Sequence, residues 1–382
     1  MIEQIILFSA LFGAIYSYFI YPIILLIISS FTKSNNPSVK IETTTLPCIS
    51  FIITAFNEEK HIADKLENTL KIDYPSDKLE IIVASDGSTD NTNSIAQSYS
   101  KQGVQLRHVS IRKGKENAQR SAIEVSIGEI LVFSDVSTQI EASALRQIAK
   151  TFQNLRVGAI SSEDRFISAD GDIAGEGAYV KYEMWLRKIE GKINSLVGLS
   201  GSFFAARREI CNNWNINVPS DFNTALNCIR NEYIAISDPE LLGYYPNLED
   251  DTKEYQRKVR TVIRGIAALF SQSSVLNPFK FGFFSFQILS HKLMRWLVPW
   301  FLIITFISNT LLLTSGIIYV ILFILQIAFY TLAFLGWSSK SLRQSTLIKL
   351  PYFFIQVNIA IADATLQYLF GKRVTLWEPS KR

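Results

Sequence analysis

The stretch "EILVFSDVST" (residues 129–138) is an apolar run, rich in β-branched residues, that ends abruptly on one carboxylate, Asp135. Nearly continuous apolar runs of this length are typical of strands buried on both faces. Similar runs occupy residues 48–57, 79–86, 104–110 and 157–162. Polar segments with apolar residues at helical spacing lie between them. This alternation predicts an α/β domain built on a doubly wound sheet.

Polar side chains stand at the ends of these runs. Asn57 and Glu58 follow the first run, Asp86 ends the second, and Asp135 ends the fourth. In a doubly wound sheet, ligands bind beyond the carboxyl ends of the strands. Each segment alone also suits a turn or the charged first turn of a helix. Because several strands deliver polar groups to one edge, we favour a binding site there.

Common cofactor signatures are absent from the sequence. No GxGxxG follows the first run and no GxxxxGK[ST] occurs, which disfavours dinucleotide cofactors and P-loop phosphate binding. Cys48, Cys211 and Cys228 show no CxxC spacing, and the histidines are scattered. A Cys/His zinc site is therefore disfavoured, and buried or inert thiols are expected.

The N-terminal segment is expected to cross a membrane. From Gln4 to Thr32 there is no charged residue, which exceeds the roughly 20 residues that span a bilayer. A cleaved signal peptide is the alternative. The lack of a preceding basic region and of a small-residue cleavage site disfavours it.

More apolar segments follow near the C-terminus. Residues 296–339 are uncharged and broken by "TSG", which predicts two spans joined by a turn. Residues 350–370 contain polar positions, so this segment either spans or lies in the plane of the interface, and we favour the in-plane helix. Residues 277–296 suit a helix in the headgroup layer or the capped start of the next span. The predicted organisation is an N-terminal transmembrane helix (1–32), an α/β domain (37–270), an interfacial helix (271–295) and a C-terminal membrane region (296–382) with two spans and a third membrane-embedded or in-plane helix.

The orientation follows from the basic residues at the flanks of these segments. Lysine and arginine next to short loops are retained on the cytosolic side. These residues are Lys33, Lys40, Lys292, Arg295, Lys340, Arg343 and Lys349. We expect a multi-pass protein of the cytoplasmic (inner) membrane whose large polar domain faces the cytosol. The net charge of +4 suggests anionic lipid contact rather than a nucleic-acid partner.

The order of these motifs resembles membrane-bound bacterial family 2 glycosyltransferases, which have the GT-A fold and build cell-surface polysaccharides or glycolipids from nucleotide-activated sugars. The resemblance extends from "FIITAFNEEKHI" through "VRTVIRG" into the membrane segments. It implies that Ala55, Asn57 and Glu58 flank a uracil base and that Asp86 bonds the base or ribose. Lys115 of "GKENA" would lie near the nucleotide.

"SDVS" occupies the place of the family's DxD motif. In an extended segment, residues i and i+2 point the same way, so two acids there can bind one divalent ion. Here Ser137 replaces the second acid. The resemblance implies Mg²⁺ or Mn²⁺ on Asp135 and Ser137, bound more weakly, because Mg²⁺ needs only one or two carboxylates besides phosphate oxygens. Ribose binding by Asp135 and a metal-independent reaction stay as alternatives.

Two further segments resemble the acceptor side of the family's site. "GLSGSFFAARREI" (198–210) corresponds to the acceptor pocket, whose small residues would admit a glycan closely, or it is a Gly-rich turn before a helix. The small residues are Gly198, Ser200, Gly201 and Ser202. "VPSDFNTALN" (218–227) stands where relatives carry a general base, which makes Asp221 the candidate.

Other acids compete with Asp221. Glu249, Asp250 and Asp251 of "NLEDDTKEY" look like the acidic motif, but they stand too close before the basic segment. A solvated acidic loop or the start of a helix is the plainer interpretation.

The basic segment is "EYQRKVRTVIRG" (254–265), in which Arg257, Arg260 and Arg264 fall on one helical face. Guanidinium groups suit diphosphate oxygens. The resemblance assigns Arg257 and Arg260 to the diphosphate, although Thr261 replaces the tryptophan of the family's QxxRW, which puts long-chain processivity in doubt. A basic helix on anionic headgroups is the alternative.

The resemblance implies an inverting glycosyltransferase that moves a sugar from a UDP-sugar to a lipid-linked or growing glycan. Single-sugar transfer to polyprenyl phosphate is an alternative within the class. A non-catalytic nucleotide-binding scaffold of a polysaccharide-assembly complex is the alternative from another class.

Overall fold

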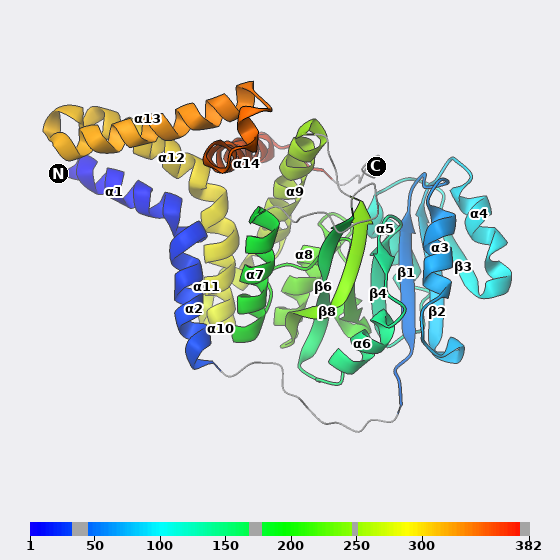
Figure 1. Ribbon diagram of the computed structural model, residues 1–382. Helices are drawn as coiled ribbons and strands as arrows, with labels where there is room; N and C mark the ends of the chain where they lie inside the picture. Colours follow the sequence, from blue (N-terminus) through cyan, green and yellow to red (C-terminus); the bar gives the residue numbers. More distant parts are fainter. Residues whose placement is uncertain (33–44, 168–177, 247–250, 375–382) are drawn as a thin grey trace. The chain divides into compact units, whose positions relative to one another are not determined.

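A mixed sheet of eight strands in the described residues forms the centre of the α/β part of the chain (Figure 1). The computed structural model describes residues 1–32, 45–167, 178–246 and 251–374. The strands are β1 (Ile49–Ala55), β2 (Leu79–Asp86), β3 (Val104–Val109), β4 (Ile130–Asp135), β5 (Gln139–Ile140), β6 (Val157–Ile167), β7 (Phe203–Arg207) and β8 (Ile234–Pro246). Their order is β3-β2-β1-β4-β7-β6-β8-β5.

The chain divides into two compact units, which are described separately. We call Met1–Ile24, Asp250–Ile266 and Phe286–Arg373 the membrane unit. The α/β unit comprises Leu25–Glu249, Ala267–Ser285 and Val374–Arg382.

Helices cover both faces of the sheet. Alternate residues of a strand point to opposite faces, so Phe51 and Ile53 of β1 enter one core and Ile52 enters the other. The first core is closed by α3 (Ile62–Leu70), α4 (Thr92–Ser98) and α6 (Ala144–Thr151). The second is closed by α5 (Lys115–Ile123) and α8 (Ser220–Arg230). The predicted α/β sheet with helices on both faces is confirmed.

The sheet has a parallel half and a mixed half. Strands β3, β2, β1 and β4 pair in parallel, as the apolar runs predict. Strand β7 then pairs antiparallel to both β4 and β6. The sequence did not predict β5, β7 or β8. Strand β7 escaped prediction because the small residues before it suggested a turn leading to a helix, whereas Phe203–Arg207 is a strand.

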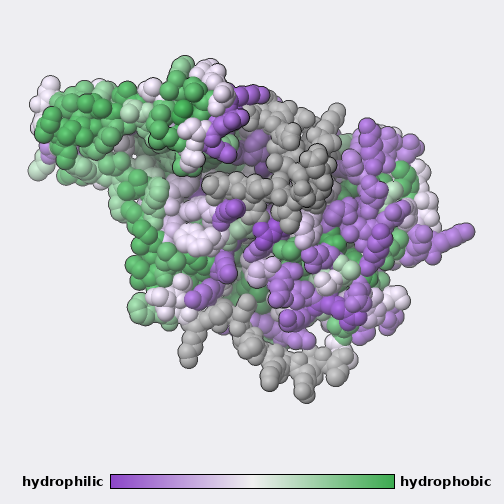
Figure 2. Space-filling view, viewed as in Figure 1, coloured by the Kyte–Doolittle hydropathy of each residue, from purple (hydrophilic) through white to green (hydrophobic). Residues whose placement is uncertain are grey.

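Among the described residues, four helices are long and apolar enough to cross a membrane. They are Ile2–Phe31, Phe283–Leu311, Ile317–Ser338 and Thr346–Leu369. Figure 2 shows hydrophobic side chains gathered over α1 (Ile2–Ile15) and α13 (Ile317–Ser338). The N-terminal segment and the two halves of 296–339 are therefore helices of the predicted kind. Whether the last helix crosses or lies in the plane stays a prediction.

The second of these helices begins earlier than residue 296. It combines α11 (Phe283–Ile288), a π-helical turn over Leu289–Leu293 and α12 (Met294–Leu311). The short helix α10 (Pro278–Phe281) stands before it, separated by Gly282 at φ +54°. Residues 283–296 of the segment expected in the headgroup layer are thus continuous with the apolar helix that follows it.

Close helix contacts hold the membrane unit together. A Cβ atom on Gly13 of α1 would lie 2.6 Å from the ring of Phe301 in α12, so only glycine allows this approach. The Tyr16 hydroxyl lies 2.9 Å from Ser290 Oγ. Tyr255 of α9 (Asp251–Ser271) donates to Asp363 of α14 (Thr346–Leu369) at 3.1 Å. This bond gives the half-buried carboxyl group of an apolar helix a hydrogen-bond donor.

Candidate active site

The loops after β1 and β2 interlock at the carboxyl edge of the sheet. Asn57 has left-handed backbone geometry, with φ +51°, and its amide donates to Ser88 Oγ at 3.1 Å. Its side-chain oxygen accepts from the Thr89 amide at 2.8 Å. The Glu58 amide donates to Thr92 Oγ1 at 2.8 Å. These bonds hold the loop after Ala55 against the loop after β2. We call the two joined loops the rim, and the nucleoside is predicted to bind there.

Asp86 ends β2 and is completely buried. Its Oδ1 accepts from the Lys113 amide at 3.0 Å and its Oδ2 accepts from the Gly114 amide at 2.8 Å. The carboxylate therefore fixes the loop that leads into α5. Each carboxylate oxygen can accept more than one bond, so the predicted contact of Asp86 with a base or ribose stays a prediction.

Arg112, in the same loop, was not singled out by the sequence. Its guanidinium lies over the ring of Phe56, 3.8 Å from the ring centre. The backbone of Gly87 approaches closely, since a Cβ there would lie 2.9 Å from the Arg112 amide nitrogen. A cation stacked on an aromatic ring makes a flat surface beside the end of β1. The basic run "IRKGK" was the only signal for it.

Lys115 joins three segments that are distant in sequence. It begins α5, directly after Gly114 at φ +107°. Its ammonium forms an ion pair with Asp135 Oδ1 at the end of β4 and donates to the Gly201 carbonyl at 2.7 Å. The side chains of Lys115 and Asp135 are only 8% and 19% exposed. The structure thus places two of the predicted donor residues in direct contact.

The segment after Asp135 turns instead of continuing as a strand. Residues 136 and 137 form a turn, closed by the Thr138 amide donating to the Asp135 carbonyl at 3.2 Å. The assumption of an extended "SDVS" is therefore wrong. The chain must change direction here because β5 pairs with β8 rather than continuing β4. A strand pleat does not place Asp135 and Ser137 on one face, and the role of Ser137 toward a metal stays a prediction.

Lys65 of α3 lies beneath this turn and is completely buried. Its ammonium donates to Ser134 Oγ at 2.8 Å and to the Thr138 carbonyl at 2.5 Å. Burial lowers the pKa of Lys65 to about 7, against the opposing pull of the Asp135 charge. Lys65 was not among the predicted site residues, although its helical spacing with Ile62 and Leu66 placed it on the buried face.

Asp221 lies against the same turn that Lys115 contacts. It is in the first turn of α8, where the helix dipole favours a carboxylate. A Cβ on Gly201 would lie 3.2 Å from Asp221 Oδ2, so the two residues are neighbours. Lys115, Asp135, Gly201 and Asp221 therefore meet in one place of the α/β unit.

The small residues before β7 form an irregular segment that bends at Gly201 and Ser202, and we call this bend the turn before β7. Ser200 is buried and its amide donates to Ser161 Oγ at 2.8 Å, while the Ser202 carbonyl accepts from the Asp135 amide at 2.9 Å. Gly198 lies at the start of this segment. A role for Gly198, Ser200, Gly201 and Ser202 in holding an acceptor stays a prediction.

The remaining predicted residues belong to the membrane unit. The basic segment is helical, as predicted, within α9. Arg257 pairs with Glu254 at 2.8 Å, one turn earlier. A role for Arg257 and Arg260 at a diphosphate stays a prediction. Of the competing acids, Glu249 and Asp250 lie outside the described residues.

The donor set for a divalent cation is small. In the part of the chain that the structure describes, no three or more His, Cys, Asp or Glu side chains cluster in a way that could hold a metal ion. Asp135 supplies one carboxylate, of which Oδ1 accepts from Lys115. Such a site fits Mg²⁺ or Mn²⁺ only where diphosphate oxygens complete the coordination.

The cysteines have no place in this site. Burial raises the pKa of both the Cys211 and the Cys228 thiol, and neither forms a disulfide. Buried thiols of this kind are unreactive. The prediction of buried thiols is confirmed for these two, whereas Cys48 is half-buried.

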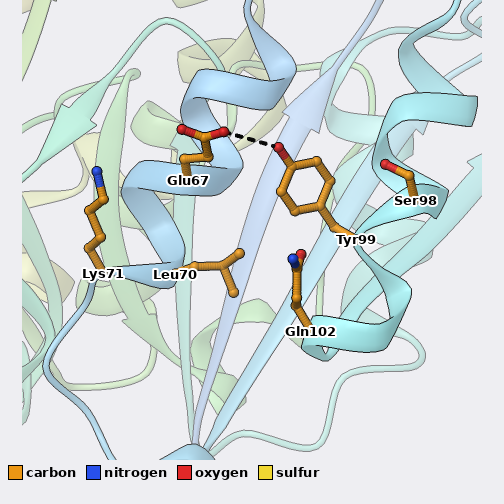
Figure 3. Close-up of a pocket in the computed structure, with 6 residues that line it drawn as sticks. All are labelled: Glu67, Leu70, Lys71, Ser98, Tyr99 and Gln102. Atoms are coloured by element: carbon orange, nitrogen blue, oxygen red, sulfur yellow. Dashed lines mark hydrogen bonds between the residues drawn. The ribbon is translucent and has the colours of Figure 1, made fainter.

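A shallow pocket elsewhere in the α/β unit is separate from the site. Its volume is about 480 Å³, and it is lined by Glu67, Leu70, Lys71, Ser98, Tyr99 and Gln102 (Figure 3). Tyr99 donates to Glu67 across it at 3.4 Å. The lining residues come from the C-terminal end of α3, the C-terminal end of α4 and the short segments that directly follow these two helices. Since these helices run back from the carboxyl edge, the pocket lies at the opposite edge of the sheet.

Comparison with known proteins identifies the domain. Residues 50–215 match the model of the family described as glycosyl transferase family 2. A beta-monoglucosyldiacylglycerol synthase from Nostoc sp. is 27% identical over 186 residues, 46% of this chain and 40% of that protein. A poly-beta-1,6-N-acetyl-D-glucosamine synthase from Staphylococcus epidermidis is 28% identical over 169 residues, 42% of this chain and 40% of that protein. The chain thus spans well under half of the length of these relatives.

A solved structure shares the fold. It is a mannosyltransferase from Pyrobaculum calidifontis in complex with GDP-Man and Mn²⁺, with a TM-score of 0.72 and 19% sequence identity. The match covers 98% of this chain and 100% of that one. Residues 50–215 therefore match glycosyl transferase family 2, and the α/β unit has the GT-A fold.

Proposed function

We propose that this chain is an inverting glycosyltransferase that moves a sugar from a UDP-sugar to a lipid-linked or growing cell-surface glycan. The observation that carries the proposal is the meeting of Lys115, Asp135 and Asp221 at the Gly201 turn. On the donor side, transfer needs groups that stabilise the leaving diphosphate, and Lys115 and Asp135 would provide them. On the acceptor side it needs a base, and Asp221 would provide it. The two relatives named above, by their names, make a glucosyldiacylglycerol and a poly-N-acetylglucosamine.

On the donor side, the nucleoside would bind at the interlocked rim of β1 and β2. Ala55, Asn57, Glu58 and Asp86 are its proposed contacts, and the flat pair of Arg112 on Phe56 borders them. Lys115 would donate to the diphosphate, with Arg257 and Arg260 as further cations for the leaving group. Ammonium and guanidinium groups stabilise the negative charge that builds up as the sugar departs.

A divalent cation would sit beside Asp135. Asp135 and Ser137, together with diphosphate oxygens, would hold Mg²⁺ or Mn²⁺, which neutralises the leaving diphosphate. Asp135 and Ser137 are the two proposed protein ligands, and Oδ1 of Asp135 also accepts from Lys115, so diphosphate oxygens would supply the rest of the coordination. We therefore expect cation binding to depend on the nucleotide.

On the acceptor side, Asp221 would act as general base. It would take the proton of the acceptor hydroxyl while the oxygen forms a bond to the anomeric carbon. The bond from that carbon to the phosphate oxygen breaks on the opposite face, so one displacement inverts the configuration. Because Ser200 is buried, the turn at 198–202 would serve the acceptor through its small volume rather than through the Ser200 hydroxyl.

The proposed location is the inner membrane, with the α/β unit in the cytosol. The four apolar helices of the described residues and the basic residues that flank them support this orientation. A lipid-linked acceptor would then lie in the same membrane. Partners for polysaccharide assembly are a further expectation.

The test is nucleotide release by the lipid-reconstituted chain, supplied with lipid-linked acceptors and with UDP-, GDP- or CMP-sugars, with and without Mg²⁺ or Mn²⁺. We expect release from UDP-sugars, stimulated by the cation. Asp221→Asn should lower transfer by roughly 10²-fold or more, with nucleotide affinity unchanged. An active Asp221→Asn variant would remove Asp221 from the mechanism, and binding without release from any donor would favour the scaffold alternative.

Transfer of a single sugar to polyprenyl phosphate is the second candidate. Thr261 stands where processive relatives have a tryptophan that helps to bind the acceptor. The chain therefore lacks an acceptor contact that supports repeated addition of sugars. Product length on an extracted lipid acceptor distinguishes the candidates. One sugar per lipid supports single transfer, and a ladder of products supports polymerisation.

A further inference from the structure

Asp164 of β6 is an acid of the α/β unit that the proposed mechanism does not use. The Ser200 hydroxyl donates to its Oδ1 at 2.6 Å, and the Ser202 hydroxyl donates to the same oxygen at 3.2 Å. The two serine hydroxyls lie 3.0 Å apart. One carboxylate oxygen therefore holds both ends of the three-residue turn Ser200–Ser202.

The middle of this turn faces the residues that carry the proposed chemistry. The Gly201 carbonyl accepts from Lys115 at 2.7 Å, and the Gly201 Cα lies beside Asp221. The Ser202 carbonyl accepts from the Asp135 amide at 2.9 Å. Any shift of the turn would consequently change the places of Lys115, Asp135 and Asp221 together.

We propose that Asp164 is a positioning residue, which sets the Ser200–Ser202 turn and through it the relative placement of Lys115 and Asp221. Only its kinetic consequence rests on the proposed function. The placement itself follows from hydrogen bonds that exist whatever reaction the chain performs.

The hydrogen-bond geometry favours this role over a role as base. The Asp164 carboxyl accepts from Ser200, Ser202 and Tyr245, and Arg187 adds a favourable charge. Burial nevertheless raises the pKa of Asp164. A carboxyl group that costs free energy to bury and is enclosed by hydroxyl donors is suited to orienting them. Asparagine keeps one accepting oxygen in the same place, so the role requires the acceptor and not the charge.

Asp238 of β8 provides a matched control. It is buried, at 6% exposure, whereas Asp164 is half-buried, and its Oδ2 accepts from Gln147 at 2.9 Å and from Thr151 at 2.6 Å. It is also a carboxylate held by side-chain donors, two in number, but these donors belong to α6 rather than to the turn. Its loss should disturb the fold without moving the turn.

The first test is amide hydrogen exchange of the full chain in lipid. Asp164→Ala should speed exchange at residues 198–204 and at the Asp135 amide by roughly 10-fold, because the turn opens more often. Asp164→Asn should leave exchange there close to wild type. Asp238→Ala should speed exchange only near residues 147–151 and 234–240. Unchanged exchange at 198–204 in Asp164→Ala, or the same increase there in Asp238→Ala, would overturn the inference.

The second test is kinetic. Asp164→Ala should lower kcat by on the order of 10- to 100-fold, since a misplacement of about 1 Å costs that much, with KM for the donor changed far less. Asp164→Asn should restore most of the rate. If Asp164→Ala does not fold, Ser200→Ala removes the shortest of the bonds from the other side and should show the same kcat loss in smaller degree. Equal loss in Asp164→Asn and Asp164→Ala would contradict positioning through an acceptor.

The two proposals fail in different ways. Failure of the proposed function would appear as an active Asp221→Asn variant or as a wild-type chain without transfer. Failure of the inference on Asp164 would appear in hydrogen exchange, which does not depend on any reaction.

Discussion

Lys115 and Asp135 form a nearly buried ion pair between the start of α5 and the end of β4. The pair joins two of the residues that are predicted to bind the sugar donor. Each partner has a second bond from the same region, since Lys115 donates to the Gly201 carbonyl and the Asp135 amide donates to the Ser202 carbonyl. The ion pair is therefore hydrogen-bonded to the turn before β7, on the proposed acceptor side, as well as lying on the proposed donor side.

Lys115→Met should weaken nucleotide binding by roughly 10-fold, because the diphosphate loses a charge-assisted donor. The variant should also melt at a lower temperature, since Asp135 then lacks its partner in a mostly buried place. Titration calorimetry with UDP measures the first effect and thermal unfolding the second. Lys101→Met, which removes an exposed lysine, is the control. An unchanged affinity for UDP in Lys115→Met would exclude Lys115 from the diphosphate.

Ser137→Asp should strengthen Mn²⁺ binding in the presence of UDP, by on the order of 10-fold, because a second carboxylate then joins the coordination. Electron paramagnetic resonance of Mn²⁺ gives the affinity without any turnover. Ser110→Asp, which adds an acid at an exposed position of the loop after β3, controls for general charge. Because residues 136 and 137 form a turn, the result also reports whether position 137 reaches the cation at all. No gain over the Ser110→Asp control would show that it does not.

Part of the site could be predicted because it depends on local pattern. The apolar runs mark strands buried on both faces, and parallel strands bring their carboxyl ends to one edge. That reasoning placed Asp86 and Asp135 at the same edge, and the motif around Lys115 placed the lysine near them. The structure shows Lys115 in contact with Asp135.

The rest depends on pairings between segments far apart in the sequence. Asp164 reaches Ser200 only because the antiparallel strand β7 lies beside β6. Lys65 reaches Ser134 only because the turn after β4 folds back over α3. No spacing rule connects residues 36 or 69 positions apart. For the same reason the turn at 136–137 was taken as extended, since the pairing of β5 with β8 that causes it is not visible locally.

Gly201→Ala should lower kcat several-fold with little effect on stability. The added methyl group would lie 3.2 Å from Asp221 Oδ2, which is closer than ordinary contact, so the carboxylate must move by a few tenths of an ångström. General-base catalysis is sensitive to such a shift, because the proton must be within hydrogen-bond reach. Gly191→Ala, where the nearest atom would be 3.7 Å away, is the matched control. Steady-state kinetics gives kcat of both variants. Equal kcat for Gly201→Ala and Gly191→Ala would mean that the acceptor hydroxyl does not approach Asp221 from the side of Gly201.

Lys65→Met should change how stability depends on pH. Burial lowers the pKa of Lys65 from 10.5 to about 7 in the folded chain. Between these values the unfolded chain holds a proton that the folded chain has released, so the free energy of unfolding of the wild type rises with pH across this window. Below about pH 7 both forms hold the proton, and the full cost of the buried charge is present.

Methionine removes that titration, while the loss of the bonds to Ser134 and Thr138 costs the same at every pH. We compare the free energy of unfolding of Lys65→Met with that of the wild type at each pH. The variant minus wild-type difference should be about 3 kcal/mol more positive at pH 6.5 than at pH 9.5. Denaturant unfolding of the reconstituted chain at the two pH values measures it, with Lys101→Met as the exposed control. A difference between variant and wild type that is the same at both pH values would mean that Lys65 stays charged throughout, held by its two acceptors and by Asp135.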